Sequence, residues 1–159
     1  MIVVSDTSCI TNLIQIDQLI LLSKLYSTII ITPIVKEELQ SFHSFSEETI
    51  TSLGIFLQTP KNTSAVNLLM NDLDAGESES IVLAEELHAD FLLVDERQAT
   101  KIAKQRGLTT IGILGIILLA KDLKHIEFIK PLLDDLKTKT TFRFSNVLYT
   151  HLLQLANEQ

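Results

Sequence analysis

The chain has 159 residues, one cysteine, no tryptophan, 46% hydrophobic residues and a formal net charge of −7. This composition excludes a disordered or low-complexity protein and favours one compact domain over residues 1–159, with its core in 1–120 and C-terminal helices in 121–159. The longest apolar run, residues 111–120, is half of the roughly 20 residues that a membrane-spanning helix needs, so no membrane association is expected. The N-terminus lacks the basic region of a signal peptide, and the lone cysteine favours a reducing, cytoplasmic compartment.

The predicted elements alternate between strands and helices. In chain order, the first half is expected to contain a strand (2–5), a helix broken near Asp17 (8–26), a strand (28–32), two helices (33–42 and 46–53), a short extended piece (55–58) and, after a turn, another helix. The second half is expected to contain a helix (77–87), a strand (91–94), a helix (96–105), a strand (109–111) and three helices (113–123, 126–137 and 146–156). This alternation predicts an α/β domain with a parallel sheet.

Charge is distributed unevenly along the chain. Residues 1–96 hold 3 basic and 15 acidic side chains, whereas residues 97–143 hold 10 basic and 4 acidic ones. The division is compatible with an acidic pocket beside a basic surface, as a metal-dependent nuclease needs. The alternative is that these charges are simply scattered over solvated faces.

Acidic residues follow two of the predicted strands and occur on two of the predicted helices. Asp6 follows the first strand, and Asp95 and Glu96 follow the strand at 91–94. The acids on the helices are the pairs Glu37 and Glu38, and Glu77 and Glu79. Open parallel sheets bind ligands beyond the carboxyl ends of their strands, so these segments are expected to bring acids to one edge. Crowded carboxylates repel one another unless a cation neutralises them, and Mg²⁺ prefers such oxygen ligands.

Four segments together resemble the PIN domain family over residues 1 to about 120. They are VVSDTS at 3–8, PIVKEEL at 33–39, LDAGESE at 73–79 and LLVDER at 92–97. The stretch from Gly76 to Ile81, with Gly107 and IGILG at 111–115, is similar to a small prokaryotic PIN-like group often found in toxin–antitoxin loci. The resemblance implies a three-layer α/β/α sandwich around a parallel sheet of about four to five strands, with a helical C-terminal tail.

The resemblance also implies an endoribonuclease that uses Mg²⁺ or Mn²⁺. Its acids fall on Asp6, Glu38, Glu77 and Asp95, with Glu37 a weaker choice than Glu38. Glu79 and Glu96 remain alternatives to Glu77 and Asp95 as metal ligands. Thr7 and Ser8 are expected to orient Asp6 or a metal-bound water, and Ser8 can also cap the first helix. Implied partners are RNA, a cognate antitoxin protein and a second copy of the chain.

Basic side chains suited to RNA lie on the helix predicted at 96–105. Arg97, Lys101 and Lys104 are spaced to share one face and are candidates for contacts with the RNA backbone. Their alternative role is as solvated surface charges. For Asp74, the alternative reading as a helix cap or turn residue is preferred over a functional one.

Two other classes of function stay open. The first is a phosphohydrolase with Asp6 as a covalent nucleophile, although such enzymes generally have a second Asp where this chain has Ser8. The second is a catalytically silent PIN-like module that binds a partner protein. Its partner surface would be an apolar stripe formed by Val147, Leu148, Leu152 and Leu155, whose other use is packing onto the domain.

Overall fold

A computed structural model describes residues 1–159 and contains one five-stranded sheet in which every neighbouring pair of strands is parallel. The strands are β1 (Val3–Ser5), β2 (Ile29–Ile31), β3 (Ile55–Leu57), β4 (Phe91–Leu93) and β5 (Thr110–Ile111). Their order across the sheet is β3-β2-β1-β4-β5, which places β1 at the centre. The strands match the predicted apolar runs, including the short extended piece, which forms β3.

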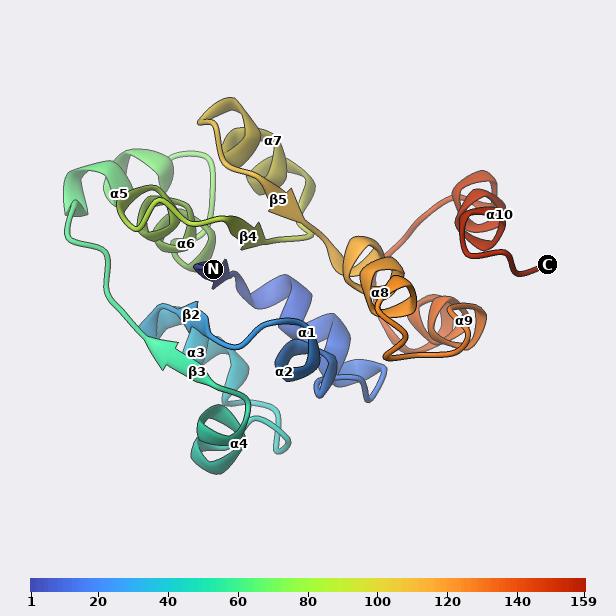
Figure 1. Cartoon of the computed structure of the whole chain (residues 1–159). Coiled ribbons are helices and arrows are strands. Elements are labelled where there is room, and N and C mark those ends of the chain that lie inside the picture. The colour runs from blue at the N-terminus through green and yellow to red at the C-terminus, as the bar shows by residue number, and fades with distance from the viewer.

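Helices cover both faces of the sheet, as Figure 1 shows. Side chains alternate between the two faces of a strand, so Val3 lies in one hydrophobic cluster and Val4 in the other. The larger cluster includes residues of α1 (Thr7–Gln15), α2 (Leu21–Leu25), α3 (Pro33–Leu39), α4 (Glu47–Ser52), α8 (Ile113–Asp122), α9 (Lys130–Lys139) and α10 (Asn146–Leu155). The smaller one includes residues of α5 (Thr63–Leu69), α6 (Ala75–Glu86) and α7 (Arg97–Gln105). The three-layer α/β/α prediction is confirmed.

Two local predictions concern helix ends. The expected break near Asp17 is confirmed, because Asp17 has a φ of 56° between α1 and α2. The predicted helix over 126–137 begins too early, since α9 starts only at Lys130. Pro131 suits a first helical turn, where its missing N–H costs no hydrogen bond.

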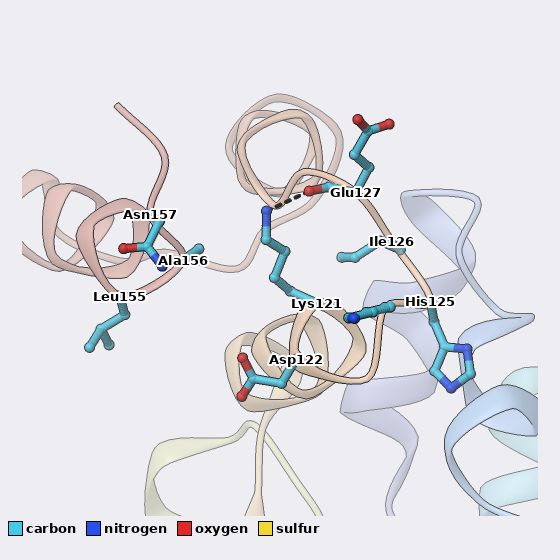
Figure 2. Close-up of a pocket in the computed structure, with 9 residues that line it drawn as sticks. Lys121, Asp122, His125, Ile126, Glu127, Leu155, Ala156 and Asn157 are labelled. Carbon is cyan, nitrogen blue, oxygen red and sulfur yellow. Dashed lines mark hydrogen bonds between the residues drawn. The ribbon is translucent and has the colours of Figure 1, made fainter.

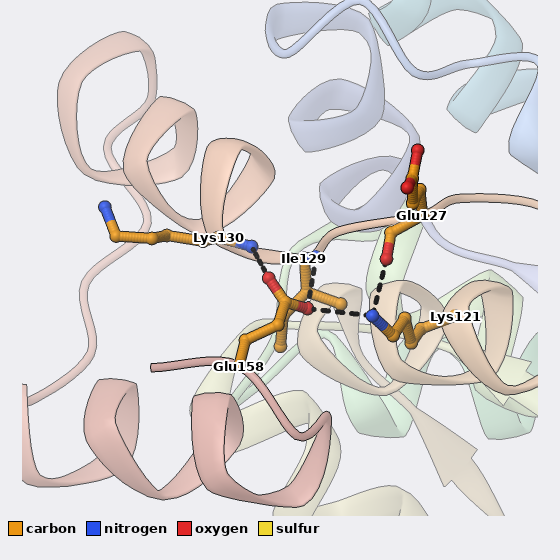
Figure 3. Close-up of polar contacts among 5 residues, drawn as sticks. All are labelled: Lys121, Glu127, Ile129, Lys130 and Glu158. Carbon is orange, nitrogen blue, oxygen red and sulfur yellow. Dashed lines mark hydrogen bonds and ion pairs between the residues drawn. The ribbon is translucent and has the colours of Figure 1, made fainter.

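A glutamate with a buried side chain accepts hydrogen bonds from backbone N–H groups at the start of α9. The Glu158 carboxylate accepts hydrogen bonds from the N–H groups of Ile129 (2.8 Å) and Lys130 (3.1 Å) and pairs with the Lys121 ammonium at 3.3 Å (Figure 3). Burial alone would raise the pKa of Glu158, but these donors outweigh it and hold the pKa below its usual value. Glu158, three residues beyond the end of α10, thereby ties the C-terminus to both α8 and α9.

Contacts between α9 and α10 fix the C-terminal pair further. The Tyr149 hydroxyl donates to Asp134 at 2.6 Å, and the Lys137 ammonium lies 4.0 Å from the centre of the Tyr149 ring. None of the helices is both long and apolar enough to cross a membrane.

Candidate functional site

The turns that follow β1 and β4 lie side by side at one edge of the sheet. Ser5 pairs with Leu93 in register, and the Asp6 N–H donates to the Leu93 carbonyl at 2.9 Å. Ser8 joins the two turns, because its hydroxyl accepts the Asp95 N–H at 2.9 Å and donates to the Asp6 carboxylate at 3.3 Å. The expectation that Ser8 caps the first helix is wrong, since Asp6 occupies the N-cap position and Ser8 lies inside α1.

Glu38 reaches this edge from α3. Its carboxylate accepts a hydrogen bond from the Thr7 hydroxyl and lies against the first turn of α6. A Cβ atom added at Gly76 would stand 2.9 Å from Glu38 Oε1, so the close approach requires a residue without a side chain. Thr7 therefore contacts Glu38, while Ser8 contacts Asp6.

Asp74 and Glu77 form a capping box at the start of α6. The Asp74 carboxylate accepts the Glu77 N–H at 2.8 Å, and the Glu77 carboxylate accepts the Asp74 N–H at 3.2 Å. The structure therefore gives Asp74 its predicted role as a helix cap. It also places the charge of Asp74 near Asp6, which the sequence reasoning missed, although the Asp-x-x-Glu spacing was a visible signal for the capping box.

Two of these acids bind protons far more tightly than usual. The Asp6 side chain is only 3% exposed, and burial, together with the charges of Asp74 and Glu38, raises its pKa to about 7. Burial also raises the pKa of Glu77 to about 7, with contributions from the charges of Asp74, Asp6 and Glu96. None of the ion pairs in the protein involves these acids, so no protein cation pairs directly with the cluster.

Asp95 is held from inside the protein. Its Oδ1 accepts the Ile113 N–H at 2.8 Å, and its Oδ2 accepts the Asn12 amide at 3.0 Å and the Cys9 thiol at 3.2 Å. Burial raises the pKa of Asp95, and these donors oppose the rise. The sequence did not predict Asn12 or Cys9 as partners of Asp95, because more than 80 residues separate each from Asp95 and no local pattern links them.

The two alternative ligands lie in different settings. The Glu96 carboxylate caps α7 by accepting the Ala99 N–H at 2.7 Å, and its charge acts on Glu77. Glu79 has one carboxylate oxygen that is buried without a hydrogen-bond partner. The structure thus places Asp6, Glu38 and Glu77 near one another, with Asp74 and Glu96 nearby. The Asp95 carboxylate is held separately, by hydrogen bonds from Ile113, Asn12 and Cys9.

The donor set suits a hard divalent ion. No three His, Cys, Asp or Glu side chains converge closely enough to hold an ion by themselves. Mg²⁺ binds through one or two carboxylates and keeps several waters, so it does not require such a cage. The buried Asp6 carboxylate, crowded by other acids and paired with no protein cation, fits an ion of this kind.

The predicted RNA-binding residues border a cleft beside α7. Arg97, Lys101, Glu96 and Asp72 line this cleft of about 520 Å³, whereas Lys104 is exposed further along the same helix. A further cleft, of about 560 Å³, lies elsewhere, between the α8–α9 connection and the end of α10 (Figure 2). None of the clustered acids lines it, and its Lys121 is bonded to the Glu127 carbonyl.

Comparisons with known proteins agree with this architecture. The model of the DUF3368 family, described as a PIN domain, matches residues 2–158. A solved structure of a PilT N-terminus domain protein, SSO1118 from the hyperthermophilic archaeon Sulfolobus solfataricus P2, is similar with a TM-score of 0.56 and 23% sequence identity, over 79% of this chain and 97% of that one. No curated protein sequence is significantly similar. The match over nearly the whole chain shows that this protein belongs to the PIN domain family.

Proposed function

We propose that the protein is a metal-dependent endoribonuclease that hydrolyses RNA phosphodiesters at the cluster around Asp6. The observation that carries the proposal is a buried carboxylate, with a pKa of about 7, that lies among further acids and forms no ion pair with a basic side chain. PIN domains are generally nucleases, which supports a hydrolase acting on nucleic acid.

Mg²⁺ or Mn²⁺ would be held by one or two of the carboxylates of Asp6, Glu38 and Glu77, with waters as its other ligands. A bound ion of this type lowers the pKa of a coordinated water and stabilises charge on phosphoryl oxygens. The chain's own contribution is orientation: Ser8 positions the Asp6 carboxylate and Thr7 positions that of Glu38. Asp95 holds the turn through its backbone N–H to Ser8 and its carboxylate to Ile113.

The cleft beside α7 supports RNA as the substrate. Arg97 and Lys101 line it next to Glu96, whose charge reaches Glu77 in the acid cluster. A strand lying on these side chains would have its phosphates neutralised close to the acids. Lys104 would extend the same contact along α7.

A partner protein forms part of the proposal. Three apolar side chains of α10 are exposed, with Val147 81%, Leu148 36% and Leu155 57% accessible. Such a surface suits a second copy of the chain or an antitoxin protein that restrains the nuclease. Membership of a toxin–antitoxin pair is the cellular role that we propose for this activity.

The test is cleavage of a mixed RNA pool by purified protein at low salt, with Mg²⁺, with Mn²⁺ and with EDTA, and with single-stranded DNA in parallel. Asp6→Asn should abolish cleavage. Asp17→Asn is the matched control, because Asp17 is exposed and its positive φ suits asparagine equally well.

Cleavage that requires the metal and is lost only in Asp6→Asn supports the proposal. Equal activity in Asp6→Asn and wild type would contradict the assignment of cleavage to Asp6. Absence of cleavage in all proteins, with retained binding of a partner protein, would favour the silent binding module. Cutting of DNA alone would exclude RNA as the substrate.

A further inference from the structure

Glu96 also lines a second cleft, whose other side is formed by the connection between α9 and α10. This cleft has a volume of about 430 Å³. Its lining includes Ser8, near the start of α1, and Asp95 and Glu96, which follow β4. It also includes Thr141, Phe142 and Arg143 from the connection between α9 and α10. The guanidinium of Arg143, from the connection between α9 and α10, thus shares a cleft with Asp95 and Glu96, which follow β4.

Two hydrogen bonds within the connection orient the exposed side chain of Arg143. One nitrogen of its guanidinium, Nη1, donates to the carbonyls of Thr140 (2.9 Å) and Phe142 (3.1 Å). The Thr140 hydroxyl in turn donates to the Leu136 carbonyl at 2.7 Å and accepts the Phe142 N–H at 3.1 Å. Arg143 takes part in none of the ion pairs, so its Nε and Nη2 donors are available to a ligand.

The acids in this cleft are already engaged with protein donors. Asp95 accepts the Ile113 N–H, the Asn12 amide and the Cys9 thiol, and Glu96 accepts the Ala99 N–H. Arg143 is the one basic side chain in the lining. A guanidinium offers a planar pair of N–H donors that matches the oxygens of a phosphate.

We propose that Arg143 binds a phosphate of the RNA strand that flanks the phosphate being cleaved. Glu96 lines both this cleft and the one that contains Arg97 and Lys101, so a strand can pass from one cleft to the other beside the acid cluster. Arg143 then sets where the strand lies relative to Asp6. The inference rests on the proposed ribonuclease function and adds a substrate-positioning residue to it.

The experiment measures binding and cleavage of a short single-stranded oligoribonucleotide by the full chain. Binding is measured in EDTA, where no cleavage is expected, at several salt concentrations. Arg143→Gln removes the charge and keeps a donor for the Thr140 carbonyl, and Arg143→Lys restores a charge without the planar fork. Lys24→Gln is the matched control, because Lys24 is exposed, forms no ion pair and does not line either cleft.

Arg143→Gln should weaken binding about tenfold, raise KM with little change in kcat, and lower the slope of log K against log salt by about 0.7. Arg143→Lys should recover only part of the affinity. A set of oligonucleotides, each with one phosphate replaced by a neutral methylphosphonate, locates the contact. For wild type, a methylphosphonate at one flanking position should weaken binding relative to the unmodified oligonucleotide. For Arg143→Gln, the same replacement should cause no further loss of affinity.

The outcomes separate this inference from the proposed function. If wild type binds and cleaves RNA but Arg143→Gln behaves like Lys24→Gln, the flanking-phosphate contact is wrong and the ribonuclease stands. If Arg143→Gln remains as sensitive to each methylphosphonate as wild type, the contact is also wrong. If wild type neither binds nor cleaves RNA, both proposals fall.

Discussion

Gly76 lies directly against the carboxylate of Glu38, so closely that an added Cβ atom would stand 2.9 Å from Oε1. The first turn of α6 therefore limits where the Glu38 side chain of α3 can lie. A similar relationship exists between Gly112 and Asp95, where a Cβ atom would stand 2.5 Å from Oδ1. Two glycines, neither with a chemical role, thus determine where two of the acids can lie.

Gly76→Ala should displace Glu38 and lower kcat about 10- to 100-fold, because small shifts of catalytic groups are costly. The fold should persist, since alanine favours a helix over glycine by about 1 kcal/mol. Thermal unfolding and single-turnover cleavage measure the two effects. Gly115→Ala in α8 is the matched control, because its added Cβ meets only the Ile111 side chain. Equal activity of both variants would show that the position of Glu38 is not critical.

Asn12→Ala should leave one buried oxygen of Asp95 with only the Cys9 thiol as a donor. The loss of a buried hydrogen bond is expected to lower the free energy of unfolding by about 1–3 kcal/mol. Cleavage should fall as well, because the Asp95 N–H is bonded to Ser8, which also holds the Asp6 carboxylate. Urea denaturation measures the change, with Gln15→Ala, an exposed residue of the same helix, as the control. A stability equal to that of Gln15→Ala would contradict the role assigned to the Asn12–Asp95 bond.

Asp6 should make the metal-free protein less stable as the pH rises. Its folded pKa of about 7 lies above the usual value of 3.8, so the folded state holds the proton more tightly than the unfolded state does. The resulting stabilisation is complete below about pH 4 and is lost as the pH rises through about 7. Asp6→Asn stays neutral, and it should exceed wild type at pH 8 by about 2–4 kcal/mol and match it near pH 4.

Denaturation in EDTA at both pH values measures this difference, with Asp17→Asn as the control. Mg²⁺ at pH 8 should then stabilise wild type and leave Asp6→Asn unchanged, because a ligand stabilises only the state that binds it. A difference between wild type and Asp6→Asn that is the same at pH 4 and pH 8 would contradict the raised pKa.

The double variant Lys101→Glu and Lys104→Glu should bind single-stranded RNA more weakly than wild type. If both side chains contact phosphates, the slope of log K against log salt should fall by about 1.4. Fluorescence anisotropy across a salt series measures the slope, and the double variant Lys24→Glu and Lys61→Glu, at two exposed positions outside α7, controls for the change in net charge. An unchanged slope would remove α7 from the RNA-binding surface.

The strands and the side of the sheet that carries the site follow from local patterns. Short apolar runs predicted each strand, and Asp6 and Asp95 each follow one directly, so their meeting at the sheet edge needed only the rule for parallel sheets. The capping box at Asp74 was similarly visible in its spacing, although its closeness to Asp6 was not.

The remaining contacts depend on how distant segments pack. Nothing near Asn12 in the sequence indicates that its amide meets a carboxylate 83 positions away. The roles of Gly76 and Gly112 appear only when α3 and the turn after β4 are placed in space. Arg143 was counted only as part of a basic segment, because its cleft exists only after the α9–α10 connection folds back to Ser8.

Because β1 is only three residues long, the packing of Val3 and Val4 in the two cores also determines where Asp6 lies. Val3 and Val4 belong to opposite cores, and two residues later the chain leaves the sheet at Asp6. One residue inserted between Val4 and Asp6 would either turn the acid away from its neighbours or exchange the two valines between the cores. A change in the length of this segment would therefore move the site relative to the two cores even if every contact around Asp6 could otherwise be kept.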